Sequence, residues 1–132
     1  MDNEPEWIMN RNRPKHLALH LIKLPLPGVV SILHRISGLV LFLLLPLLLL
    51  MLQYSLRSIE TYTRLLEVLQ NPVIKLILLG TGWAFFHHFL AGIRYLAIDL
   101  DLGVGLAPAR ATSRLVLITS LALTVMWGVW LW

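Results

Sequence analysis

Residues 39–52 read Leu-Val-Leu-Phe-Leu-Leu-Leu-Pro-Leu-Leu-Leu-Leu-Met-Leu and contain no polar side chain. A helix of a soluble bundle normally keeps one polar face, so apolar residues on every side indicate a helix surrounded by lipid. Pro46 inside this run is compatible with that environment, because helices in lipid tolerate proline and kink there. The stretch therefore predicts a membrane-spanning helix near residues 29–55.

Two later stretches, 76–93 and 115–132, also lack charged residues. At about 1.5 Å per residue each is long enough, or nearly so, for a hydrocarbon core of roughly 30 Å. Asn71-Pro72 is typical of a helix start, whereas Gly103, Gly105 and Pro108 indicate a loop. We therefore expect an all-α integral membrane bundle of three transmembrane helices, near 29–55, 71–98 and 110–131. A short cytoplasmic N-terminal segment, 1–28, precedes this domain of residues 29–132.

The composition supports a lipid-facing chain and narrows its chemistry. Of the 132 residues 58% are hydrophobic and only 14% charged, which is little charge for a soluble surface. There is no cysteine, so the chain cannot supply thiolates to an iron–sulfur centre or a zinc cluster. The net charge of +4 is not gathered with aromatic residues on one face, so we expect no nucleic-acid partner.

The basic residues predict the orientation. Lys and Arg are more frequent in cytoplasmic segments than on the other side of a membrane. On one side of the predicted spans stand Arg11, Arg13, Lys15, Lys23, Arg35, Arg94, Arg110 and Arg114; on the other stand Arg57, Arg64 and Lys75. We expect the N-terminus in the cytoplasm and the C-terminus outside, in a bacterial-type inner (cytoplasmic) membrane.

Polar side chains within a span are costly and therefore point to function. Ser31 and Arg35 lie four residues apart, so they share one face of the first helix, with His34 on the adjoining flank. A haem propionate or a quinone carbonyl would satisfy the guanidinium of Arg35. Snorkelling of Arg35 to lipid headgroups would satisfy it equally well.

The second span carries His87 and His88, which point about 100° apart on a helix. Gly80, Ala84, His88 and Gly92 recur at every fourth position and form a smooth stripe. A flat macrocycle could lie on this stripe with the His88 imidazole reaching its metal. The alternative is a small-residue stripe for helix packing, with His88 hydrogen-bonded across it.

The cytoplasmic end of the second span brings further polar groups to one level. This span runs antiparallel to the first, so Arg94 and Tyr95 return to the depth of His34 and Arg35. That level would suit haem propionates. We expect a plain structural role for Asp99.

Together these motifs resemble the cytochrome b subunit of succinate dehydrogenase. The resemblance rests on Arg13-Pro14, on Ser-Ile-Leu-His-Arg-Ile-Ser-Gly at 31–38, and on His88 followed by Gly92-Ile93-Arg94 and Asp99. It covers nearly the whole chain, and the two motifs at this spacing are specific as a pair.

The resemblance implies a membrane-anchor subunit that binds haem b and helps to form the quinone-reduction site for ubiquinone or menaquinone. It implies His88 as axial ligand of the haem iron, and Ser31 and Arg35 as quinone-binding residues. His34, Arg35, Arg94 and Tyr95 would lie at the haem propionates or periphery. The implied partners are a second small anchor subunit with the other haem ligand, an iron–sulfur subunit and a flavoprotein subunit, which oxidises succinate. This chain alone would hold no complete active site.

One position departs from the family pattern. Tyr95 stands where the family often has histidine, and a tyrosine can donate a hydrogen bond but cannot carry positive charge. An essential proton role at this position is therefore in doubt. Two other functions remain open, a fumarate reductase anchor and a purely structural anchor without haem.

Overall fold

The computed structural model describes residues 24–132, and this part of the chain is helical apart from short connections. Its helices are α1 (Leu26–Ser55), α2 (Ile59–Leu69), α3 (Pro72–Asp99) and α4 (Leu106–Leu131). Three of them, α1, α3 and α4, are long and apolar enough to cross a membrane. The expected all-α membrane protein is therefore confirmed. Helix α2 was not predicted, and the interpretations of Arg11, Arg13, Pro14, Lys15 and Lys23 lie outside the described residues.

Two helices begin earlier than the prolines and glycines suggested. Pro27 and Gly28 belong to the first turn of α1, and Pro108 to the first turn of α4. The first four N–H groups of a helix have no partner inside it, so a proline there costs no hydrogen bond. We therefore expected these prolines and this glycine just before each helix, whereas they lie in its first turn.

Helix α3 has clear signals at both ends. The Asn71 side chain accepts a hydrogen bond from the Val73 N–H at 2.9 Å, with Pro72 as the first helical residue, as predicted. At the other end Asp101 adopts φ 60°, and the N–H groups of Asp101 and Leu102 donate to the carbonyls of Ile98 and Ala97. This Schellman turn ends the helix and starts the short connection to α4.

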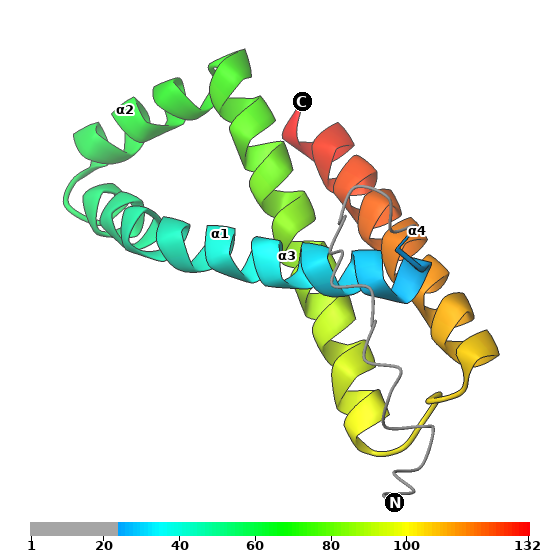
Figure 1. Ribbon diagram of the computed structural model, residues 1–132. Helices are drawn as coiled ribbons and strands as arrows, with labels where there is room; N and C mark the ends of the chain where they lie inside the picture. The colour runs from blue at the N-terminus through cyan, green and yellow to red at the C-terminus, as the bar shows by residue number, and fades with distance from the viewer. Residues whose placement is uncertain (1–23) are drawn as a thin grey trace, which may run out of the picture.

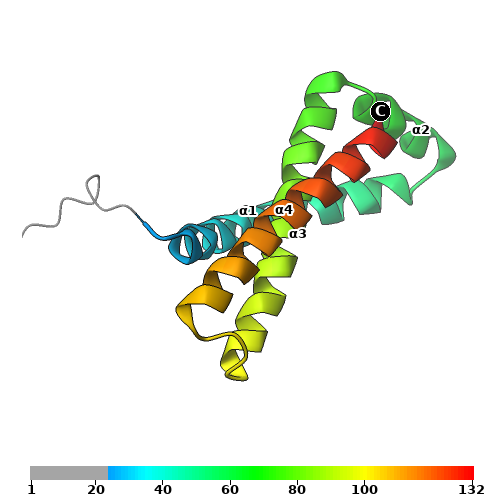
Figure 2. The same ribbon diagram turned by 90° about the vertical axis from the view of Figure 1, so that its right-hand side faces the viewer.

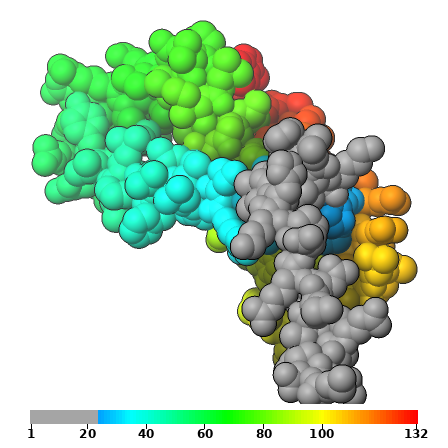
Figure 3. Space-filling model, in the orientation of Figure 1, coloured from blue at the N-terminus to red at the C-terminus, as the bar shows by residue number. Residues whose placement is uncertain are grey.

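The three long helices form an open arrangement. In Figure 1, α3 and α4 run side by side and antiparallel, and α1 crosses them steeply; Figure 2 shows the same crossing from the side. The beginning of α1 packs on α3 and α4. Its end extends away from this pair, as the space-filling view in Figure 3 shows. Helix α2 bridges the far ends of α1 and α3.

Small and hydroxylated residues line the contact between α3 and α4. Ser113, Ser120 and Thr124 are buried on α4, and their hydroxyl groups bond to carbonyls of their own helix. On α3, a methyl group at Gly82 would come within 2.2 Å of the Trp127 ring. Helices in lipid associate through such small residues, because close backbone approach replaces the hydrophobic drive.

Candidate functional site

His88 lies at the crossing of α1 and α3, facing α1. Its Nδ1 atom is 3.1 Å from the main-chain carbonyl oxygen of His34 and 3.4 Å from the Ser37 hydroxyl. The Ser37 hydroxyl itself donates to the same His34 carbonyl at 2.9 Å. His88 is therefore held from α1 by two oxygen atoms that belong to one turn of that helix.

The carbonyl acceptor on α1 favours one tautomer of the neutral His88 ring. A carbonyl oxygen only accepts, so Nδ1 of His88 must carry the hydrogen and donate it. In the neutral ring, Nε2 then keeps a free lone pair, and no described residue hydrogen-bonds to it. Metal-binding histidines typically donate their second ring N–H to a carbonyl or carboxylate in this way. The residues present thus fit an axial ligand that binds iron through Nε2.

His34 and Tyr95 continue the cluster on one side of His88. The rings of His34 and His88 stack at 4.3 Å between centroids, with 5° between their planes. Tyr95 meets His34 at 5.1 Å in a tilted arrangement. Three of the expected residues are therefore brought together, two from α3 and one from α1.

The predicted stripe on α3 is covered by α1 over its later half. A methyl group at Gly92 would meet Nε2 of His34 at 3.8 Å, so the His34 ring lies over that glycine. Gly38 of α1 lies against His88, where an added methyl group would come within 2.7 Å of Cε1. At His88 and Gly92 the stripe therefore takes part in packing against α1, although both residues stay partly exposed. Gly80, at the other end, has no neighbour within 4 Å.

His87 points to a different environment from its neighbour. It is fully buried and stacks on Trp83 at 5.2 Å between ring centroids. Neither ring nitrogen has a hydrogen-bond partner among the described residues. The prediction that the two histidines point to different surroundings agrees with these contacts.

Arg94 turns toward α4 and away from His88. It is only 8% exposed, and its Nε donates to the Thr112 hydroxyl at 3.0 Å. One terminal nitrogen also lies 3.4 Å from the Ala109 carbonyl, and the guanidinium stands 5.4 Å from the Tyr95 ring centroid. Arg94 therefore ties α3 to α4, a contact that was not anticipated.

Ser31 and Arg35 lie on the outer side of the same segment of α1. Ser31 is half-buried and Arg35 is exposed. No hydrogen bond or ion pair of the Arg35 guanidinium occurs with the part of the chain that is described, and Asp99 is exposed and unpaired there too. Among the described residues, no hydrogen bond or ion pair joins Arg35 to His88, Arg94 or Tyr95.

The contacts that two residues of the cluster make with His88 were not predicted from the sequence. Ser37 and Gly38 stood in the quoted motif, but neither was given a role. Ser37 is three residues after His34, a spacing that allows its hydroxyl to reach the His34 carbonyl. That spacing was the available signal; the contact of Gly38 with His88 depends on how two helices cross and has no local signature.

Known proteins resemble this chain over most of its length. Residues 9–127 match the family described as "Succinate dehydrogenase/Fumarate reductase transmembrane subunit". A relative from Coxiella burnetii, named succinate dehydrogenase cytochrome b556 subunit, is 38% identical over 94% of this chain and all of its own length. Proteins of the same name from Rickettsia felis and Paracoccus denitrificans are 29% and 30% identical, over 96% and 87% of this chain and 98% and 88% of their own.

The names of these relatives bear on the alternatives. All three are cytochrome subunits of succinate dehydrogenase, which favours that interpretation over a fumarate reductase anchor and over an anchor without haem. The matched region includes Ser31, His34, Arg35, His88, Arg94 and Tyr95. The chain belongs to the family of succinate dehydrogenase and fumarate reductase transmembrane subunits.

Proposed function

We propose that this chain is the membrane-anchor cytochrome b subunit of a succinate dehydrogenase, which binds haem b and helps to form a quinone-reduction site. The hydrogen bond from His88 Nδ1 to the His34 carbonyl carries the proposal. It orients an imidazole inside the membrane and leaves Nε2 available, which is the requirement for a haem ligand.

The haem would lie between this chain and a second anchor subunit that supplies the other axial ligand. The contacts of His34 support a ligand from outside this chain. Apart from His87 and His88, His34 is the one histidine in the described helices, and its ring stacks parallel to that of His88. Because its ring is stacked on that of His88, His34 would not hold the same iron together with His88, and a residue of the partner subunit would do so. When bound, haem b supplies a one-electron carrier close to the quinone.

The quinone would bind near Ser31 and Arg35 on the turn of α1 that holds His34. The Ser31 hydroxyl can donate a hydrogen bond to a quinone oxygen, and the Arg35 guanidinium favours negative charge gained on reduction. The exposure of Arg35 supports this role, because its donors are not engaged by the described residues. His34 and Tyr95 would lie at the haem propionates with Arg35, and Arg94 would reach them only by leaving Thr112.

The proposed orientation puts this site on the cytoplasmic side. The bias of Lys and Arg places the N-terminus and the α3–α4 connection there. Electrons would arrive from an iron–sulfur subunit that receives them from a flavoprotein subunit, where succinate is oxidised. This chain would contribute binding and electron transfer but no succinate chemistry.

Replacing Arg35 tests the quinone site. In the purified complex, Arg35→Ala should lower quinone reduction by at least tenfold, while succinate oxidation with a soluble artificial acceptor stays unchanged. Arg64→Ala, which removes an equal charge from α2, is the matched control and should leave both rates unchanged. Equal loss of both activities in Arg35→Ala would indicate failed assembly instead, whereas unchanged quinone reduction would contradict the proposed role.

Replacing His88 tests the haem site separately. His88→Ala should abolish or strongly shift the visible absorption of reduced haem in the complex. An unchanged haem spectrum, with the complex intact, would show that His88 is not the ligand. This chain could then be an anchor that holds no haem itself.

A further inference from the structure

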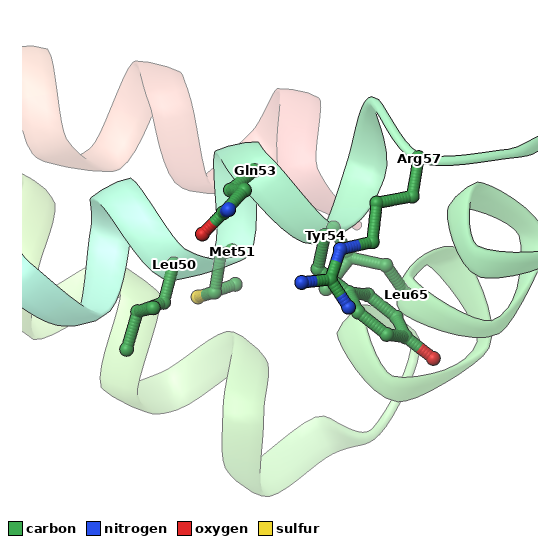
Figure 4. A pocket seen from close by; sticks show the side chains of 6 residues that line it. All are labelled: Leu50, Met51, Gln53, Tyr54, Arg57 and Leu65. Carbon is green, nitrogen blue, oxygen red and sulfur yellow. The ribbon is translucent and has the colours of Figure 1, made fainter.

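A pocket lies at the opposite end of α1 from the histidines, beneath α2. Its volume is about 310 Å³, and its lining residues are Leu50, Met51, Gln53, Tyr54, Arg57 and Leu65 (Figure 4). None of these residues belongs to the proposed haem or quinone sites. Any occupant of this pocket would therefore be distinct from the haem and the quinone.

The lining of this pocket changes from apolar to polar along α1. Leu50 and Met51 belong to the long apolar run, and Leu65 of α2 faces them from the other side. Polar groups begin immediately after the run, with Gln53, Tyr54 and Arg57. An uninterrupted apolar stretch that ends in tyrosine and arginine marks the boundary between hydrocarbon and headgroups. The pocket spans this boundary.

The two arginines near the pocket differ in their pairing. Arg64 on α2 forms an ion pair with Glu60 at 2.7 Å, one turn away. The guanidinium of Arg57 forms no hydrogen bond or ion pair with any described residue, and Figure 4 shows its side chain bent back over Tyr54 toward the pocket. An unpaired guanidinium at headgroup depth is complementary to phosphate, which it can bind through two parallel N–H donors.

Helix α2 has the properties of a helix that lies in the interface. Ser58 and Thr61 cap its start with reciprocal hydrogen bonds. Ile59, Tyr62 and Leu66 repeat at helical spacing on one side, and all three are exposed, Ile59 by 86%. A short amphipathic helix with an exposed apolar face at the end of a span lies along the headgroup region with that face in the acyl chains.

We propose that the pocket between α1 and α2 binds an anionic phospholipid. The phosphate would accept hydrogen bonds from Arg57, with Tyr54 beside it, and an acyl chain would follow Leu50 and Met51 toward the membrane centre. The apolar lining residues match an acyl chain, and the unpaired guanidinium of Arg57 matches a phosphate. The position at the end of the apolar run of α1 matches the depth at which these two parts of a lipid meet. The proposal depends neither on haem nor on quinone.

The test compares two arginines in the complex purified with its natural partners. Added phosphatidylglycerol should raise the unfolding midpoint of the wild-type protein and of Arg64→Gln, and lipid extraction should recover bound phosphatidylglycerol from both. Arg57→Gln should lose most of this rise and retain several-fold less lipid. Arg57→Lys, which keeps the charge, should recover part of both effects.

Three results would overturn the proposal. Arg57→Gln could behave like Arg64→Gln, or phosphatidylcholine could stabilise the protein as strongly as phosphatidylglycerol, so that no anionic site exists. Loss of a partner subunit from Arg57→Gln, with lipid retention unchanged, would assign the pocket to a protein contact instead.

Discussion

The two halves of α1 have opposite surroundings although they form one continuous helix. In the first half Val30 and Ser37 are buried, and His34 lies between α1 and α3. In the second half Leu43 and Leu50 are 65% and 60% exposed. The half that carries His34 and Ser37 is the more closely packed against α3 and α4, whereas the leucine-rich half is mostly exposed.

This difference shows how a membrane helix divides its tasks. Leucine gains nothing by leaving acyl chains for another apolar surface, so a run of leucines specifies insertion but no partner. Glycine, serine and histidine specify contacts, because they allow close approach and need hydrogen bonds. The two halves should therefore respond very differently to substitution.

The largest effect is expected at Gly38. An added methyl group would lie 2.7 Å from His88 Cε1, so Gly38→Ala must displace the His88 ring or separate α1 from α3. Overpacking of this kind costs about 1–3 kcal/mol, and we expect a lower unfolding midpoint with loss or a shift of haem absorption. Gly80→Ala, with open space at its Cβ, is the matched control and should be neutral or slightly stabilising. Equal behaviour of the two variants would show that α1 does not cross α3 at Gly38.

A smaller effect is expected at Ser37. Ser37→Ala removes the hydroxyl that lies 3.4 Å from His88 Nδ1, but leaves the His34 carbonyl as the main acceptor at 3.1 Å. The loss should be about 0.5–1 kcal/mol, measured as a modest fall in the unfolding midpoint with haem content retained. Complete loss of haem from this variant would mean that the hydroxyl, and not the carbonyl, orients the ring.

Gly92 should tolerate what Gly38 does not. A methyl group at Gly92 would meet His34 at 3.8 Å, an ordinary contact distance. We expect Gly92→Ala to change stability by less than about 0.5 kcal/mol and to keep the haem spectrum. A severe defect would show that another group, such as haem itself, comes closer to Gly92 than His34 does.

The sequence allowed the spans to be predicted well, because they depend on apolarity along one segment. Observed helices begin or end within about four residues of the expected limits, an offset common at helix ends. Helix α2 was overlooked, since its short amphipathic pattern is weak beside three apolar runs. The Asn71-Pro72 start of α3 was recognised because capping is a local property.

The candidate site was predictable in its members but not in all its contacts. Helical spacing separated His88 from His87, and antiparallel spans brought Tyr95 to the level of His34. The same reasoning placed Arg94 beside Arg35, whereas Arg94 bonds to Thr112 on α4. Periodicity states which residues share a face, but which helix covers that face depends on packing between distant segments.

For the chain by itself, the smallest effect is expected in the apolar half of α1. Leu43→Ala and Leu47→Ala remove exposed side chains, and alanine is as good a helix former as leucine, so neither should disturb the fold of this chain. In the assembled complex, however, each of the two variants would report whether its position faces lipid or a partner subunit. A side chain that faces lipid should leave the midpoint unchanged within error, whereas one covered by a partner subunit should lose about 2 kcal/mol or more, as in any packed core. Unfolding midpoints of both variants, measured on the complex, would therefore show which part of this exposed half meets lipid and which part meets protein.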